Sequence, residues 1–277
     1  MKIATYNIMS GGFGNYSSSI PKTPERLPLL KQALKTIGAD FLGLVDTFHW
    51  RSTFLPEDLQ KIFDYRCAFC IDLEDLDKDH PDRRFGGVAF LTNLPVEKFS
   101  TVRLKTRNCL KTRMTWGDRA LLDVFTVYFT DLDENTRLEQ ARTLLSEVDQ
   151  QVPTILLGDF NTLPPQEVQQ TKERFELFLH SNPTIDKNTL PYLSTYAKEL
   201  SRAEVVPLIL SAGFQDVAKK EPAPTAFTPS HPLKLPLFAR IDYIFCSSDL
   251  KVKTTEVLKG RLFDKTSDHY PLLAEID

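Results

Sequence analysis

Residues 152–161 have the sequence Val-Pro-Thr-Ile-Leu-Leu-Gly-Asp-Phe-Asn. The apolar run at 155–157 is too short for a helix of its own, and a proline and Gly158 bound it. Such a run predicts a strand that is buried on both faces. Two polar side chains, Asp159 and Asn161, follow the strand at a spacing of two. An Asx-turn that closes the strand would explain them without any function, so this stretch alone leaves both explanations open.

The composition is that of a globular protein. The chain has 277 residues, 42% hydrophobic and 26% charged, and a core of this size needs no disulfide bonds. We therefore expect the four cysteines to be free thiols. No stretch has the pattern of a signal peptide or a membrane span, so we expect a cytoplasmic monomer. We expect one α/β domain over residues 1–277, with a helical insertion around 162–212.

The net charge of −3 argues against a protein that binds duplex DNA through a general basic field. It does not exclude a nuclease, because local patches of positive charge or a bound metal can hold phosphate.

Polar side chains also lie next to or within other apolar runs of the chain. These side chains are Asn7 after residues 2–6, Asp46 after 41–45, Asp242 within 239–245, and Asp268 with His269 before 272–276. Carboxylates without a Cys–His cluster favour magnesium or manganese over zinc. A His–Asp pair adds proton chemistry. Together they suit the hydrolysis of a phosphate ester, in which a metal neutralises the phosphoryl oxygens and an activated water attacks.

Four motifs make the resemblance to a known family specific: Thr5–Ile8, Gly158–Asn161, Arg240–Phe245 and Ser267–Leu272. In order and spacing they resemble the motifs of the DNase I-like endonuclease/exonuclease/phosphatase superfamily, over essentially the whole chain. The resemblance implies an α/β (α+β) fold, a four-layer α/β/β/α sandwich. Its two mainly antiparallel sheets would lie face to face, with the site at one rim.

The resemblance also implies roles for four catalytic residues. Asp159 would orient the attacking water or protonate the leaving group, and Asn161 would hold the phosphate. His269 would face the scissile phosphorus, and Asp242 would fix its tautomer from behind. Two carboxylates near His269 should raise its pKa above the usual value of about 6.5.

On the metal side, the resemblance implies Asn7, Asp46 and Asp268 as residues that hold Mg²⁺ or Mn²⁺. The sequence departs from the family here, because relatives usually have Glu, commonly in a Gln-Glu pair, where Asp46 stands. Aspartate keeps the charge but is one methylene shorter. We therefore expect the metal to sit closer or to be bridged by water.

A second departure concerns the phosphate. Many relatives have a His, or a Tyr in the abasic-site enzymes, where Thr130 or Asp131 stands here. That residue donates to the phosphate, and an Asp carboxylate cannot. We expect the substrate to be bound near Tyr128 and Asp131, with Tyr128 or an arginine as the donor.

The sequence therefore predicts a Mg²⁺-dependent phosphoesterase. A phosphodiester, either nucleic acid or a small or lipid-derived diester, is the expected substrate. The two departures keep an alternative open, a non-catalytic binding or scaffold protein with a degenerate site.

Overall fold

The computed structural model describes residues 1–12, 26–71, 86–117, 119–182, 189–220, 223–229, 231 and 239–277. These residues form two sheets of six strands each. The first sheet has the order β11 (Val252–Val257), β12 (Leu272–Ile276), β1 (Lys2–Asn7), β2 (Phe41–Val45), β4 (Val88–Thr92), β3 (Cys67–Ile71). The second has the order β5 (Val96–Leu104), β6 (Arg107–Trp116), β7 (Arg119–Tyr128), β8 (Thr154–Asp159), β10 (Asp242–Ser247), β9 (Phe214–Asp216).

Each sheet contains one parallel pair, β1 with β2 and β7 with β8, and the other neighbouring strands are antiparallel. The sheets face each other across a core that includes Ile3, Phe41, Leu157 and Ile244. This arrangement confirms the predicted pair of mainly antiparallel sheets.

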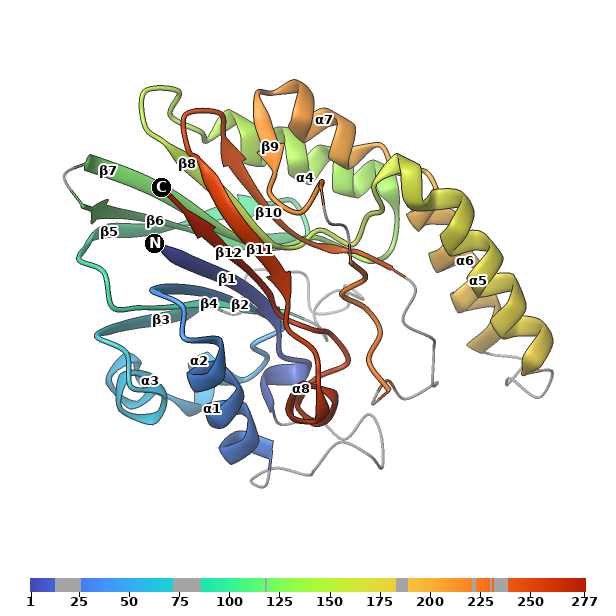
Figure 1. The fold of residues 1–277 in the computed structure, drawn as a ribbon, viewed down its shortest axis with the longest axis horizontal. Coiled ribbons are helices and arrows are strands. Elements are labelled where there is room, and N and C mark those ends of the chain that lie inside the picture. Colours follow the sequence, from blue (N-terminus) through green and yellow to red (C-terminus); the bar gives the residue numbers. More distant parts are fainter. Residues whose placement is uncertain are drawn as a thin grey trace.

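Helices cover the outer face of each sheet (Figure 1). The first sheet is covered by α1 (Arg26–Ile37), α2 (Trp50–Thr53), α3 (Pro56–Phe63) and α8 (Arg261–Thr266). The second is covered by α4 (Glu134–Ser146) and α7 (Val205–Ser211). The layers therefore follow the predicted α/β/β/α order.

Two further helices, α5 (Val168–Ser181) and α6 (Thr189–Leu200), extend past one end of the sandwich (Figure 1). A short 3-10 turn, η3 (Pro165–Glu167), precedes them, and another, η1 (Ser10–Gly12), follows β1. Both helices pack on a separate apolar cluster that includes Leu163, Tyr196 and Ile241. Since Leu163 follows β8 and Ile241 precedes β10, this cluster brings α6 to the rim where β8 ends and β10 begins.

The apolar pattern did not predict β3, β9 or β11. The side chains of Lys253, Thr254 and Glu256 on β11 are polar and mostly exposed, because β11 is an edge strand. Strand β10 begins at Asp242 rather than at residue 239, so Asp242 stands at the end of the strand instead of interrupting it. No helix in the described part of the chain has both the length and the apolar character needed to cross a membrane.

Gly158 is required where β8 passes close to β7. Its φ is 147°, and a Cβ atom there would lie 1.8 Å from the carbonyl oxygen of Val127. Backbone cannot give way as a flexible side chain can, so any other residue would push the two strands apart. The residue before Asp159 thus has to be glycine.

We predict that Gly158→Ala lowers the free energy of unfolding by about 3 kcal/mol, because it combines a backbone clash with an unfavourable φ. Gly213→Ala is the matched control, since Gly213 has a φ of 93° but no atom within 4 Å of the position that a Cβ atom would take. Chemical denaturation of both variants measures the difference. If both variants lost the same free energy of unfolding, φ alone, and not the approach of β7, would require glycine at 158.

Candidate active site

Three segments bring Asp159, Asp242 and His269 together at the rim. Asp159 ends β8 and Asp242 begins β10, and the two are direct partners in the antiparallel ladder. His269 precedes β12 and forms a bridge with Ala226. One possible ligand atom of each of the three residues lies within 4.8 Å of the others, and all three residues are buried.

His269 and Asp242 form the expected pair. His269 Nδ1 lies 2.8 Å from Asp242 Oδ2, so the carboxylate fixes which ring nitrogen carries the inner proton. The ring of Phe227 packs edge-on against the imidazole, with centroids 5.6 Å apart. The other ring nitrogen, Nε2, is thereby the one left to act on a substrate.

Asn7 links the two sheets at this point. Its Nδ2 donates to Asp159 Oδ2 at 3.1 Å, and its Oδ1 accepts from the backbone N–H of Met9 at 2.9 Å. The hydroxyl of Ser267 donates to the backbone carbonyl of Asn7 at 2.6 Å. Asn7 therefore joins the metal-side and catalytic residues that the sequence predicts.

Asn161 is held in a left-handed conformation, with a φ of 48°. Its backbone N–H donates to Asp159 Oδ1 at 2.9 Å, as in an Asx-turn, and its Nδ2 donates to the carbonyl of Phe129 at 2.9 Å. The turn thus exists, and it also serves to aim the carboxylate of Asp159 into the site.

Burial dominates the electrostatics of Asp159. Desolvation and the nearby charge of Asp242 raise its pKa, the charge of His269 lowers it, and the net pKa is about 7. A carboxyl group with such a pKa can take up or release a proton near neutral pH.

The carboxylates around His269 favour its charged form. Burial lowers its pKa, but the charge and hydrogen bond of Asp242, followed by the charges of Asp268 and Asp159, raise it to about 10. The direction agrees with the prediction from the sequence. An imidazolium here can donate a hydrogen bond to a phosphate oxygen.

Asp46 offers an oxygen that fits a cation. Its Oδ2 accepts the backbone N–H of Ser10 at 2.7 Å, whereas its Oδ1 is buried and has no hydrogen-bond partner among the described residues. Burial raises the pKa of Asp46 to about 6, and the negative charge of Asp268 adds to the rise. Two carboxylates that repel each other around an unpaired oxygen are what a hard divalent cation would stabilise.

Arg26 holds the backbone of this metal side. Its buried guanidinium donates to the carbonyls of Ile8, of Met9 at 2.8 Å and of Thr266 at 2.9 Å. These carbonyls lie within two residues of Asn7 and Asp268, so one side chain fixes both segments in place.

The set Asp159, Asp242 and His269 could also surround an ion. A histidine must be neutral to bind a metal, and the raised pKa of His269 opposes that form. A charged His269 would leave proton chemistry to this set and a cation to the side of Asp46.

Sequence reasoning did not single out Arg107, the first residue of β6. It is 1% exposed, its guanidinium lies 4.3 Å from the ring centroid of Tyr128, and its NH2 atom lies 3.6 Å from Asp131 Oδ1. Its charge also lowers the pKa of Asp46. Arg107 therefore lies beside both residues near which the sequence analysis expects the substrate, Tyr128 and Asp131. Its position next to a hairpin turn gave no signal in the apolar pattern.

We predict that NMR titration of metal-free protein gives His269 a pKa near 10, and that Asp242→Asn moves it toward about 6.5. Because the folded pKa is raised, the pair stabilises the fold fully below about pH 6.5 and loses this contribution as pH rises through 10. The stability difference between wild type and Asp242→Asn should shrink over that range. Asp249→Asn, which removes a carboxylate that contacts Ser247 instead, should leave the titration of His269 unchanged. An unmoved titration in Asp242→Asn would remove Asp242 as its cause.

Comparisons with solved structures agree with this fold. A protein from Bacteroides vulgatus described as an endonuclease/exonuclease/phosphatase has a TM-score of 0.70 at 15% identity, with 100% of this chain and 98% of that chain covered. An AP endonuclease from Archaeoglobus fulgidus has a TM-score of 0.65 at 20% identity, with 100% and 99% covered. The mannosyl-6-phosphatase Bt3783 of Bacteroides thetaiotaomicron VPI-5482 has a TM-score of 0.64 at 15% identity, with 100% and 99% covered.

A search of curated protein sequences found no match. The model of the endonuclease/exonuclease/phosphatase family, in contrast, matches residues 4–269. That span begins before Asn7 and ends at His269, and so includes every residue brought together at the rim. The chain belongs to the endonuclease/exonuclease/phosphatase family.

Proposed function

We propose that this protein is a magnesium- or manganese-dependent phosphodiesterase. The observation that carries the proposal is the buried group of Asp159, Asp242 and His269, whose ligand atoms lie within 4.8 Å of one another. Asn7 bonds to Asp159 of this group and lies opposite Val45 in the sheet. The next residue, Asp46, has a buried carboxylate oxygen that lacks a partner among the described residues.

In this proposal Asp159 and His269 have different roles in hydrolysis. Asp159, with a pKa of about 7, accepts a proton from the attacking water as the new P–O bond forms. The imidazolium of His269 donates from Nε2 to a non-bridging oxygen and stabilises the added charge. The bond to the leaving oxygen breaks, and that oxygen takes up a proton from the site or from water.

A divalent cation held by Asn7, Asp46 and Asp268 would neutralise charge on the phosphoryl oxygens and steady the leaving oxygen. Arg107 supplies a second fixed positive charge, in the region where Asp131 replaces the usual donor. Asn161 would hold the phosphate beside Asp159. These assignments keep the residues inferred from the sequence, make Asp159 the proton acceptor for the attacking water, and add Arg107.

A diester suits the charge of the site better than a monoester. A phosphodiester carries one negative charge and a monoester close to two at neutral pH. Arg107 and His269 are two positive side chains at the site, beside Asp131 and Asp242 respectively, whereas Arg26 is engaged by backbone carbonyls. The structural neighbours include both a named endonuclease and a named phosphatase. An assay must therefore compare both ester types.

We predict that purified protein hydrolyses bis(p-nitrophenyl) phosphate with Mg²⁺ or Mn²⁺ and acts more slowly on p-nitrophenyl phosphate. Asp159→Ala and His269→Ala should each lower kcat by about a thousandfold, as expected when a general acid–base or a charge-stabilising group is lost. Glu173→Ala, on the exposed face of α5, is the control. Absence of metal-dependent hydrolysis of either ester would favour the alternative, a non-catalytic binding protein on the same fold.

A separate prediction concerns the metal and needs no turnover. Titration with Mn²⁺, followed by electron paramagnetic resonance, should show one site that Asp46→Asn weakens by at least about tenfold. Asp46→Glu should bind Mn²⁺ as well as wild type or better, because it restores the longer acid of relatives. Asp64→Asn, at the exposed end of α3, is the control. A weaker site in Asp46→Glu would show that the shorter acid is tuned to this site, contrary to our account.

A further inference from the structure

Helix α6 contributes two stacked tyrosines next to the site. Tyr192 and Tyr196 are one turn apart, with ring centroids 6.2 Å apart and an interplanar angle of 9°. Tyr196 is buried, and its hydroxyl donates to Asn161 Oδ1 at 3.5 Å. The ring of Tyr192 is 52% exposed. The stack therefore runs from the residue expected to hold phosphate out toward solvent.

The exposed ring of Tyr192 is held at its tip. Its hydroxyl donates to Asp131 Oδ2 at 2.9 Å, and Asp131 Oδ1 faces Arg107 NH2 at 3.6 Å. Asp131 thus connects a cation that can hold phosphate to an aromatic ring. A single carboxylate group lies between the guanidinium and the tyrosine hydroxyl.

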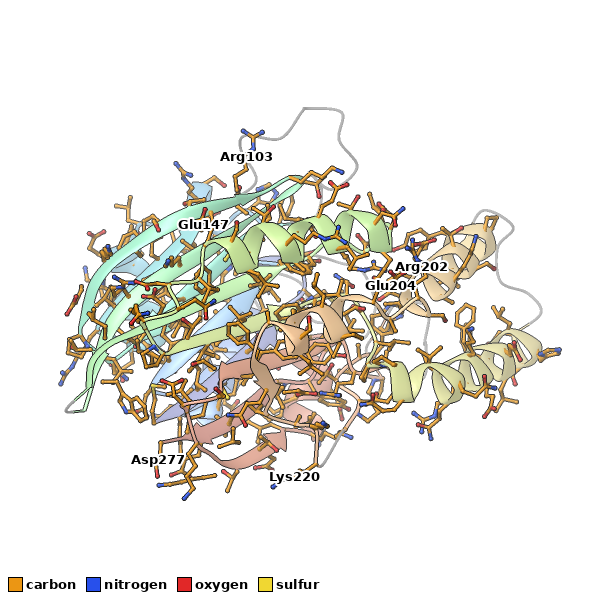
Figure 2. All side chains as sticks on the ribbon, turned by 90° about the horizontal axis from the view of Figure 1, so that it is seen from above. Arg103, Glu147, Arg202, Glu204, Lys220 and Asp277 are labelled. Atoms are coloured by element: carbon orange, nitrogen blue, oxygen red, sulfur yellow. The ribbon has the colours of Figure 1, made fainter. Side chains whose placement is uncertain are left out.

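Helix α6 itself is anchored to the sandwich at its other end. Glu199 accepts the backbone N–H of Glu134 at 3.0 Å through its side chain, and its carbonyl accepts Arg137 NH2 at 2.9 Å. Arg202 then pairs with Glu204 at 2.8 Å and lies beside it in Figure 2. The two bonds of Glu199 thus join the C-terminal end of α6 to α4, and the bond to Asp131 holds the Tyr192 hydroxyl near its other end.

We propose that Tyr192 determines specificity, and that its exposed face stacks on the nucleobase of a mononucleotide- or dinucleotide-sized substrate. This inference rests on the proposed function, which places the phosphate beside Asn161 and Arg107. Stacking suits any base, because every base has a flat π face. The net charge of −3 favours a short substrate over a long polyanion, since a long one would need a broad basic surface.

The test compares uridine 5′-monophosphate with ribose 5-phosphate, which differ by the base alone. Calorimetry with Mn²⁺ present should show that wild type binds the nucleotide about tenfold more tightly than the sugar phosphate. Tyr192→Leu should weaken binding of the nucleotide about tenfold more than binding of ribose 5-phosphate, so that the ratio of the two affinities falls close to one. Tyr192→Phe keeps the ring, so it should still bind the nucleotide several times more tightly than ribose 5-phosphate. Phe99→Leu, an exposed aromatic ring on β5, is the matched control.

Three outcomes would overturn the inference. These are equal binding of the two ligands by wild type, no binding of either, and equal weakening of both by Tyr192→Leu. The last would assign Tyr192 to the support of Asp131 and Arg107, and equal binding by wild type would point to the sugar ring or the phosphate as the recognised group. The measurement does not require turnover. Selective binding of the nucleotide without hydrolysis of bis(p-nitrophenyl) phosphate would contradict the proposed function alone. Hydrolysis without selective binding would contradict the stacking site alone.

Discussion

The site depends on the charge of His269 between two carboxylates. Asp159 and Asp242 are direct partners across the β8–β10 ladder, and like charges at such positions destabilise a sheet. An imidazolium bonded to Asp242 would offset this repulsion. Burial and the charge of Asp242 raise the pKa of Asp159 to about 7. The register of β8 and β10 places Asp159 opposite Asp242. The segment before β12 places His269 beside them. The same segment is held through Ser267 to Asn7, so that both sheets meet at this charge cluster.

Much of the site could be predicted from the sequence because its residues lie at the ends of apolar strands. Asp46, Asp159 and Asp242 each stand at the end of a strand whose apolar run is visible in the sequence, and Asp268 with His269 precede another. The partner of each atom could not be predicted in this way. At Asp46, a left-handed φ of 57° and a hydrogen bond from the backbone N–H of Ser10 to Oδ2 accompany an Oδ1 that has no partner among the described residues. Neither feature leaves a sequence pattern.

The elements that the sequence did not predict are those whose burial comes from neighbours rather than from their own pattern. Strand β11 lies at an edge and alternates polar with half-buried residues, so it lacks the continuous apolar run of β2 or β8. Helices α5 and α6 were expected as an insertion, and their helical period gave no indication that Tyr192 and Tyr196 reach the rim. That placement depends on contacts made by Glu199 with α4, more than 60 residues away along the chain.

Asp131 departs from the family pattern, and its neighbours are arranged around the changed side chain. A donor to phosphate is replaced by an acceptor, and the acceptor lies between two donors, Arg107 and Tyr192. The guanidinium is further braced by the ring of Tyr128, so the positive charge is fixed before any substrate arrives. A preorganised cation stabilises a phosphoryl group more effectively than a mobile one, because no reorganisation is needed during the reaction. The same carboxylate accepts the hydroxyl of Tyr192, so under the proposed function one side chain would link phosphate binding to recognition of the group that the phosphate carries.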